Sequence, residues 1–200
     1  MSKPLQEFCQ QVLAEHGRGW KIRQALEFAS DAVNADPDAI WYRRKSTRRA
    51  IFWENAVNKL IELVADDPHC RVIPHHDTVS FVFDDAVLVR LKKADLALRT
   101  SNIPTRQAEL FHVHQVDLFG HPGLQRIEAV YIPNRFDTGI VWSGVVAREQ
   151  DTHLWHFEFM EPVAVPVVPI PQPAQPSPAS LVRLRNQAKG AKRGNKDGNE

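Results

Sequence analysis

The residues best suited to chemistry are the cations of the segment Trp41–Trp53, which reads W-Y-R-R-K-S-T-R-R-A-I-F-W. Five of the seven residues from Arg43 to Arg49 are basic, whereas the formal net charge of the whole chain is only +1. Concentrated positive charge attracts phosphate groups and acidic protein surfaces. The segment is therefore the strongest indication of function in this sequence.

A helix is predicted to carry these cations. Asp36 followed by Pro37 is typical of a helix start, and the pattern predicts a helix from about Pro37 to Ala65. One stripe of this helix is apolar and is predicted to face the core: Ala50, Trp53, Val57, Leu60, Ile61 and Val64. The other side is predicted to combine cations with exposed aromatic side chains: Trp41, Arg44, Lys45, Arg48 and Phe52, with Arg43 and Arg49 flanking the apolar stripe.

This face has three interpretations. In the first, Arg43, Arg44, Lys45, Arg48 and Arg49 bind an acidic protein partner, and Trp41 and Phe52 anchor it. In the second, the same residues bind nucleic acid, with the aromatic rings stacking on bases. In the third, the role is structural: the aromatic side chains pack under a sheet, or the arginines pair with nearby carboxylates such as Asp31, Asp36 or Asp38.

Nine histidines raise the question of a metal site. His75 and His76 are adjacent, and His112 and His114 would share one face of a strand, with His121 nearby. No HExxH motif or paired CxxC motif accompanies them, so we predict no metal ion and no cofactor. Whether the two pairs bind metal stays open at this stage.

No catalytic residue is predicted. Asp84-Asp85 fits a turn for backbone reasons, and neither Lys92 nor Lys93 has the acidic residue two positions earlier that a metal-dependent nuclease motif requires. Ser143 is not in a nucleophile elbow, and the glycines form no phosphate-binding loop. A metal-dependent enzyme is therefore the third functional hypothesis, after an interaction protein and a nucleic-acid binder.

The elements that must position these residues change in character along the chain. Residues 4–67 show helical periodicity, with a first helix ending near Gly17 and a second near Asn34. Period-two patterns follow from Cys70 onwards and predict strands at 78–83, 86–91, 127–132, 139–147 and 154–159. A short helix is possible at Thr105–Phe111. The fold class is predicted as α+β, with an N-terminal helical layer packed on an antiparallel sheet.

Composition suggests the remaining organisation. Residues 1–161 are predicted to form one domain, 162–178 a proline-rich linker, and 179–200 a basic disordered tail. The tail offers a second set of cations for an acidic partner or nucleic acid: Arg183, Arg185, Lys189, Lys192 and Arg193. Two lone cysteines, no apolar run of about 20 residues and no signal-like N-terminus favour a cytoplasmic protein without a membrane partner.

The segment Tyr131–Trp142, Y-I-P-N-R-F-D-T-G-I-V-W, is the most motif-like part of the chain. With Arg99-Thr-Ser-Asn102, it makes the region from Thr78 to Phe159 similar to uncharacterised proteins of bacterial phages and mobile elements, some associated with Xre-type regulators. The resemblance implies a regulatory, antitoxin-like or phage–host role and no catalytic residues. We therefore expect a non-enzymatic interaction or regulatory protein.

Overall fold

The computed structural model describes residues 3–75, 78–100, 111–114 and 123–160, which all belong to the compact unit Met1–Pro162. Three predicted features lie outside the described residues: the linker 162–178, the tail 179–200 and all but the last residue of the possible helix at 105–111.

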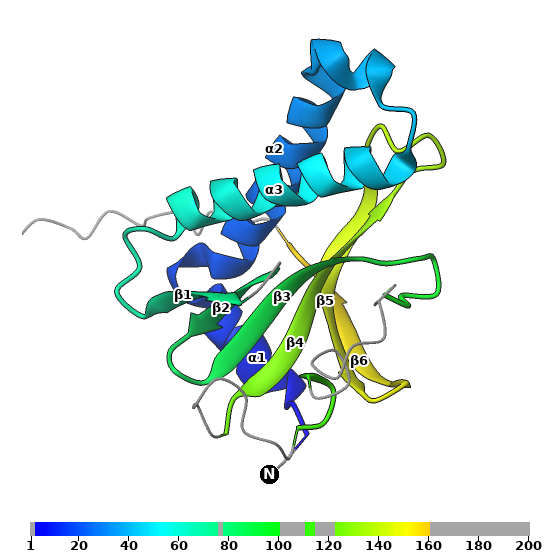
Figure 1. Ribbon diagram of the computed structural model, residues 1–200. Helices are drawn as coiled ribbons and strands as arrows, with labels where there is room; N and C mark the ends of the chain where they lie inside the picture. The colour runs from blue at the N-terminus through cyan, green and yellow to red at the C-terminus, as the bar shows by residue number, and fades with distance from the viewer. Residues whose placement is uncertain (1–2, 76–77, 101–110, 115–122, 161–200) are drawn as a thin grey trace, which may run out of the picture. The chain divides into compact units, whose positions relative to one another are not determined.

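Helices occupy the N-terminal part of the chain (Figure 1). They are α1 (Gln6–Ala14), a 3₁₀ turn η1 (Glu15–Gly17), α2 (Arg18–Ala35), a second 3₁₀ turn η2 (Pro37–Trp41) and α3 (Lys45–Leu63). The chain bends between α1 and α2, where His16 and Gly17 both adopt positive φ angles, of 51° and 63°. Glycine adopts such angles without steric cost, which explains why the first helix ends there.

The single helix predicted for Pro37–Ala65 is interrupted, and that prediction is wrong in this respect. Asp36 caps the η2 turn by accepting a hydrogen bond from Asp38 N at 2.9 Å, and it also accepts one from the Tyr42 hydroxyl at 2.5 Å. Tyr42 and Arg44 then have ψ angles of 88° and 131°, which are not helical. The two bonds to one carboxylate hold the chain in a separate turn, so α3 begins only at Lys45.

Six strands form one sheet in the order β1-β2-β3-β4-β5-β6. Their bounds are Cys70–His75, Thr78–Phe83, Val87–Lys93, Gln125–Pro133, Ile140–Glu149 and Thr152–Glu158. All neighbouring pairs are antiparallel except β3 and β4, which run parallel. The predicted α+β class and the predicted strands are confirmed.

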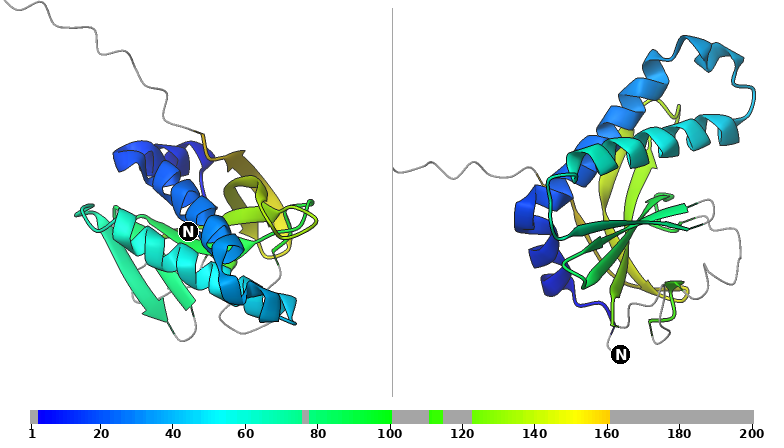
Figure 2. Two further views of the ribbon diagram at one scale, coloured as in Figure 1. Left: turned by 90° about the horizontal axis from the view of Figure 1, so that it is seen from above. Right: turned by 60° about the vertical axis from the view of Figure 1, so that its left-hand side comes forward.

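The helices cover one face of the sheet, and the main core lies between these two layers (Figure 2). Alternate residues of the central strands point into it, including Phe81, Val89, Ile127 and Val145. This arrangement follows from the period of two along a strand, which sends successive side chains to opposite faces. The position of α3 over the sheet is fixed by this burial.

A buried ionic network ties the helical layer to the sheet. The Arg18 side chain is fully buried; its Nε donates to Asp67 Oδ2 at 2.7 Å, and its Nη1 donates to Asp84 Oδ2 at 2.5 Å. The guanidinium also lies 5.2 Å from the centre of the Phe83 ring. Hydrogen bonding to Arg18 lowers the pKa of both carboxyl groups, so both stay ionised at neutral pH.

Charged groups also lie on the sheet face away from the helices. The Glu128 carboxylate is buried there and accepts a hydrogen bond from Thr100 Oγ1 at 3.0 Å. His112 Nε2 lies 3.6 Å from Glu128 Oε1, and Arg148 Nε lies 3.8 Å from Glu128 Oε2. Burial, reinforced by the charge of Arg148, lowers the pKa of His112 to about 4, so this imidazole is neutral at pH 7.

Candidate functional site

Six of the seven predicted partner-binding residues of this segment lie in three locations. Trp41 lies in η2 and is 71% exposed. Arg43 and Arg44 lie in the non-helical connection to α3, and both are exposed. The cations Lys45, Arg48 and Arg49 occupy the first two turns of α3 (Lys45–Leu63).

Phe52 is not an exposed anchor, which corrects the predicted orientation of the helix. Its side chain is only 8% exposed and stacks on Tyr131 of β4, with ring centres 4.2 Å apart. Ala56 is also buried, whereas Ile61, expected in the core, is 38% exposed. The buried stripe is shifted because α3 packs against both α2 and the sheet, and the wheel alone could not set its rotation.

The predicted structural alternative for the arginines is also not what the structure shows. Arg48 donates to the side-chain oxygen of Asn34 at 2.5 Å, and not to Asp31, Asp36 or Asp38. Asp36 is used instead by the backbone and by Tyr42. The cations of α3 are therefore not neutralised by the acidic residues nearest to them in sequence.

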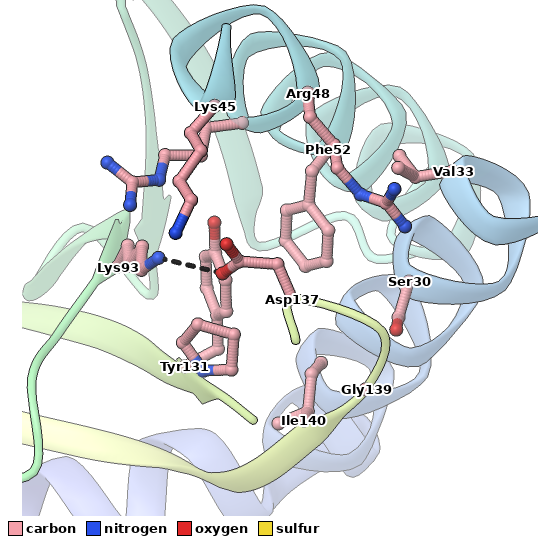
Figure 3. Close-up of a pocket in the computed structure, with 12 residues that line it drawn as sticks. Ser30, Val33, Lys45, Arg48, Phe52, Lys93, Tyr131, Asp137, Gly139 and Ile140 are labelled. Atoms are coloured by element: carbon pink, nitrogen blue, oxygen red, sulfur yellow. Dashed lines mark hydrogen bonds and ion pairs between the residues drawn. The ribbon is translucent and has the colours of Figure 1, made fainter. Parts of the chain in front are cut away.

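We define the basic cleft as two adjoining hollows beside the start of α3. An inner cavity of about 30 Å³ lies beneath the helix, and an outer cleft of about 850 Å³ opens between β3, β4 and the loops that follow them. Both are lined by Lys45, Arg49, Lys93, Pro133 and Asp137. Three parts of the chain far apart in sequence therefore build one concave site (Figure 3).

Positive charge dominates this cleft. Six cations line it against two carboxylates: Lys45, Arg48, Arg49, Lys93, Arg99 and Arg135 against Asp95 and Asp137. The resulting formal charge of +4 exceeds that of the entire chain, which is +1. The basic residues that cluster in the sequence therefore contribute to a positive electrostatic potential in this cleft.

The two carboxylates already have partners. Asp137 Oδ1 lies 3.1 Å from Lys93 Nζ, and Asp95 Oδ2 accepts a hydrogen bond from Arg99 Nε at 3.0 Å. Within the described part of the chain, Lys45 and Arg49 have no ion-pair or hydrogen-bond partner for their side chains. The cleft thus retains donors that a bound anion can use.

The position of the cations on α3 does not stabilise that helix. Its first turn contains no acidic residue and begins with Lys45, although the positive end of the helix dipole lies there. A cation at this end is unfavourable by about 0.3–1 kcal/mol where it is not screened. Helix stability therefore does not explain why Lys45, Arg48 and Arg49 stand there.

The wall opposite α3 is the turn of the motif-like segment, and Asn134 holds it in shape. Asn134 Oδ1 accepts hydrogen bonds from the backbone of Phe136 and Thr138, each at 3.0 Å. Asn34 of α2 donates to the Thr138 carbonyl at 2.7 Å and accepts from Arg48. The turn, α2 and α3 are thereby joined, so the cleft is a preformed feature.

Tyr131 forms part of the inner cavity, and its hydroxyl points toward Lys45 (Figure 3). The residue is 6% exposed, and its hydroxyl has no hydrogen-bond partner among the described residues. Burial raises the pKa of this hydroxyl above its usual range, so it remains a neutral donor. Arg48 Nε is also buried without a hydrogen bond in this part of the chain.

The histidines do not come together as a metal centre in the part of the chain that the structure describes. No three His, Cys, Asp or Glu side chains gather there in a way that could hold an ion. His114 Nε2 lies 2.7 Å from the Arg148 carbonyl, and His112 faces Glu128. His76 and His121 lie outside the described residues, as do all five tail cations of the predicted site.

Sequence reasoning did not assign Lys93, Tyr131 or Asp137 to the same site as the basic helix. One usable signal was the Lys92-Lys93 pair at the end of a predicted strand. Another was the motif-like segment Tyr131–Trp142, which supplies the floor and wall of the cleft. Neither signal could show that these parts meet the start of α3.

No protein-family model, curated protein or solved structure matches this chain. Within the described residues, no helix combines the length and the apolar composition that crossing a lipid bilayer requires. The functional proposal therefore depends on the cleft itself.

Proposed function

We propose that this protein is a non-enzymatic interaction protein that binds an acidic segment of a partner protein in the basic cleft. The observation that carries the proposal is the convergence of cations from α3 and β3 on one preformed hollow, with Lys45 and Arg49 unpaired within the described residues. A concave site with surplus charge of one sign both attracts and orients a ligand of the opposite sign.

The shape of the site favours a protein ligand over nucleic acid. Proteins that bind single strands arrange their cations along a groove that follows the phosphate backbone, with exposed rings for the bases. Here the cations converge on one hollow, and Phe52 and Tyr131 stack on each other. Exposed apolar side chains stand beside the cleft, Leu96 at 86% and Phe136 at 76% exposure, as expected for a protein interface.

Nucleic-acid binding is the second candidate because it would use the same cations, and because Trp41 is exposed and able to stack on a base. The regulatory role implied by the resemblance of Thr78–Phe159 belongs to the main proposal. A toxin or repressor encoded by a neighbouring gene would be the first natural partner to examine.

The test compares a fluorescent decaglutamate peptide with a fluorescent ten-nucleotide oligothymidylate, by anisotropy on the full chain over a salt series. The double variant Lys45→Glu/Arg49→Glu is expected to weaken peptide binding at least about tenfold, because like charges then face the ligand. Lys59→Glu is the matched control, since Lys59 lies on the same helix outside the cleft and pairs with Glu62.

Each result has a defined meaning. Peptide binding that the double variant abolishes and the control retains supports the proposal, provided that the thermal midpoints of the variants match the wild type. If the oligonucleotide binds more tightly than the peptide and the same variant abolishes it, the nucleic-acid candidate replaces the main proposal. Peptide binding that is unaffected by the double variant would show that the cleft is not the site.

A further inference from the structure

The inner cavity of the basic cleft has features beyond those needed for a string of carboxylates. At about 30 Å³ it is too small for a whole side chain, but it exceeds the roughly 10–15 Å³ that one water molecule requires. The cavity adjoins the outer cleft, with which it shares five lining residues, so a group at the end of a ligand side chain can approach it from there. The cavity therefore selects for one terminal group of the ligand.

The polar side chains around the cavity are mostly donors, and they stand among apolar side chains such as Val33, Phe52 and Ile140. Lys45, Arg48, Arg49 and Lys93 bring four positive charges, and the Tyr131 hydroxyl adds a neutral donor. The hydroxyl is directed into the cavity from a residue that is more than nine-tenths buried and has no hydrogen-bond partner in the described residues. Arg48 also lines the cavity, and its buried Nε has no hydrogen-bond partner among the described residues, so a ligand oxygen would satisfy a donor that the protein leaves unpaired.

The charge balance favours a dianion over a single carboxylate. One carboxylate, Asp137, already faces the four cations, which leaves a formal surplus of +3. A phosphate monoester carries close to two negative charges at pH 7 and three acceptor oxygens, whereas a glutamate brings one charge and two oxygens. Guanidinium groups also match the geometry of phosphate oxygens with two parallel hydrogen bonds.

We propose that the inner cavity is a subsite for a phosphorylated side chain of the acidic partner segment. This rests on the proposed function and deepens it, because the outer cleft would bind the surrounding acidic residues and the inner cavity the phosphate. Lys45, Arg49 and Lys93 contact the phosphate oxygens, and the Tyr131 hydroxyl donates a further hydrogen bond to the third oxygen that a phosphate has beyond the two of a carboxylate. A phosphorylated side chain and inorganic phosphate present the same kind of charged oxygens, so inorganic phosphate is a direct probe of the inner cavity.

The test uses three nine-residue peptides with glutamate at the eight outer positions and phosphoserine, serine or glutamate at the central position. Titration calorimetry on the full chain is expected to show the phosphoserine peptide binding about tenfold more tightly than the glutamate peptide, because of the added charge and donor contacts. Inorganic phosphate should compete with the phosphoserine peptide at millimolar concentration.

Tyr131→Phe isolates the contribution of the hydroxyl. It keeps the ring that stacks on Phe52, so its thermal midpoint should stay close to that of the wild type. The variant is expected to lose most of the preference for phosphoserine over glutamate, which is the ratio of the two affinities measured on the same variant. Lys59→Gln, on the same helix but outside the cleft, should keep the full preference.

A pH series gives a second readout that a merely structural role would not change. The second pKa of a phosphate monoester is near 6, so lowering the pH from 7 to 5 removes about one negative charge from the phosphoserine peptide. The affinity for this peptide should fall toward that of the glutamate peptide at pH 5.

The inference fails alone if the glutamate peptide binds but phosphoserine gives no advantage, or if Tyr131→Phe leaves the preference intact. If neither peptide binds, the proposed function fails together with it. The two failures are therefore distinguishable in one set of titrations.

Discussion

Among the described residues, Asp137 is the one carboxylate that lines the inner cavity of the basic cleft, and removing its charge should strengthen anion binding. Its Oδ1 lies 3.1 Å from Lys93 Nζ, in a pair whose side chains are 28% and 22% exposed for lysine and aspartate. A ligand anion that contacts Lys93 must come close to this carboxylate. Asp137 therefore opposes binding by repulsion and by occupying Lys93.

The size of the effect follows from Coulomb's law. Two like charges about 5 Å apart at an effective dielectric constant of about 20 repel each other by about 3 kcal/mol before screening. Partial exposure and salt reduce this, and we expect a net gain of about 1–2 kcal/mol, or roughly 5- to 30-fold in affinity, for Asp137→Asn. Asparagine also tolerates the positive φ of 54° at this position.

The assay is calorimetric titration of inorganic phosphate and of decaglutamate into the wild type and the variant at about 0.1 M salt. Asp95→Asn is the matched control, because Asp95 lines only the outer cleft and pairs with Arg99. The affinity of Asp95→Asn for the two anions should change less than the affinity of Asp137→Asn. If Asp137→Asn binds both anions no more tightly than the wild type while its thermal midpoint is unchanged, the inner cavity is not an anion site.

Three further predictions concern stability. Arg18→Met should lower the free energy of unfolding by about 3–5 kcal/mol in chemical denaturation, because Asp67 would be left buried without its partner. A loss below about 1 kcal/mol would show that the ionic network of Arg18 is dispensable for stability. Phe52→Ala truncates a buried side chain and should lower the free energy of unfolding by about 3–5 kcal/mol, whereas Trp41→Ala should change it by no more than about 0.5 kcal/mol. Equal losses of stability would contradict the difference in burial between the two residues. The pKa of His112 is about 4 in the folded state, below the value of about 6.5 expected in the unfolded state. As the pH is lowered, the unfolded state therefore binds the proton first, and the free energy of unfolding should fall by about 3 kcal/mol from pH 6.5 to pH 4. The difference between wild type and His112→Gln over that range isolates this contribution, and parallel pH profiles would refute it.

The strands and the fold class could be predicted because they depend on local patterns. In Thr78–Phe83, for example, successive side chains lie on opposite faces of the sheet, and the predicted strand is a strand in the structure. The parallel pairing of β3 with β4 was not predictable, since alternation along a strand does not give the direction of the neighbouring strand.

The helix boundaries and the rotation of α3 depend on contacts that a helical wheel does not include. The break after Trp41 is stabilised by the bond from Tyr42 to Asp36, six residues away. The burial of Phe52 depends on Tyr131, which follows 79 positions later in the chain. For the same reason, the cations of α3 were identified from the sequence, but their meeting with Lys93 and Asp137 was not.

The most direct test of the central claim is a heteronuclear NMR titration of the isotope-labelled full chain with the decaglutamate peptide. It separates the cleft from the basic residues at 183–200, which could also attract the peptide. If the cleft binds the peptide, the largest shifts will fall on Lys45, Arg49, Lys93 and Tyr131 and will saturate together. Shifts confined to residues 183–200, or scattered over the surface without saturation, would contradict it.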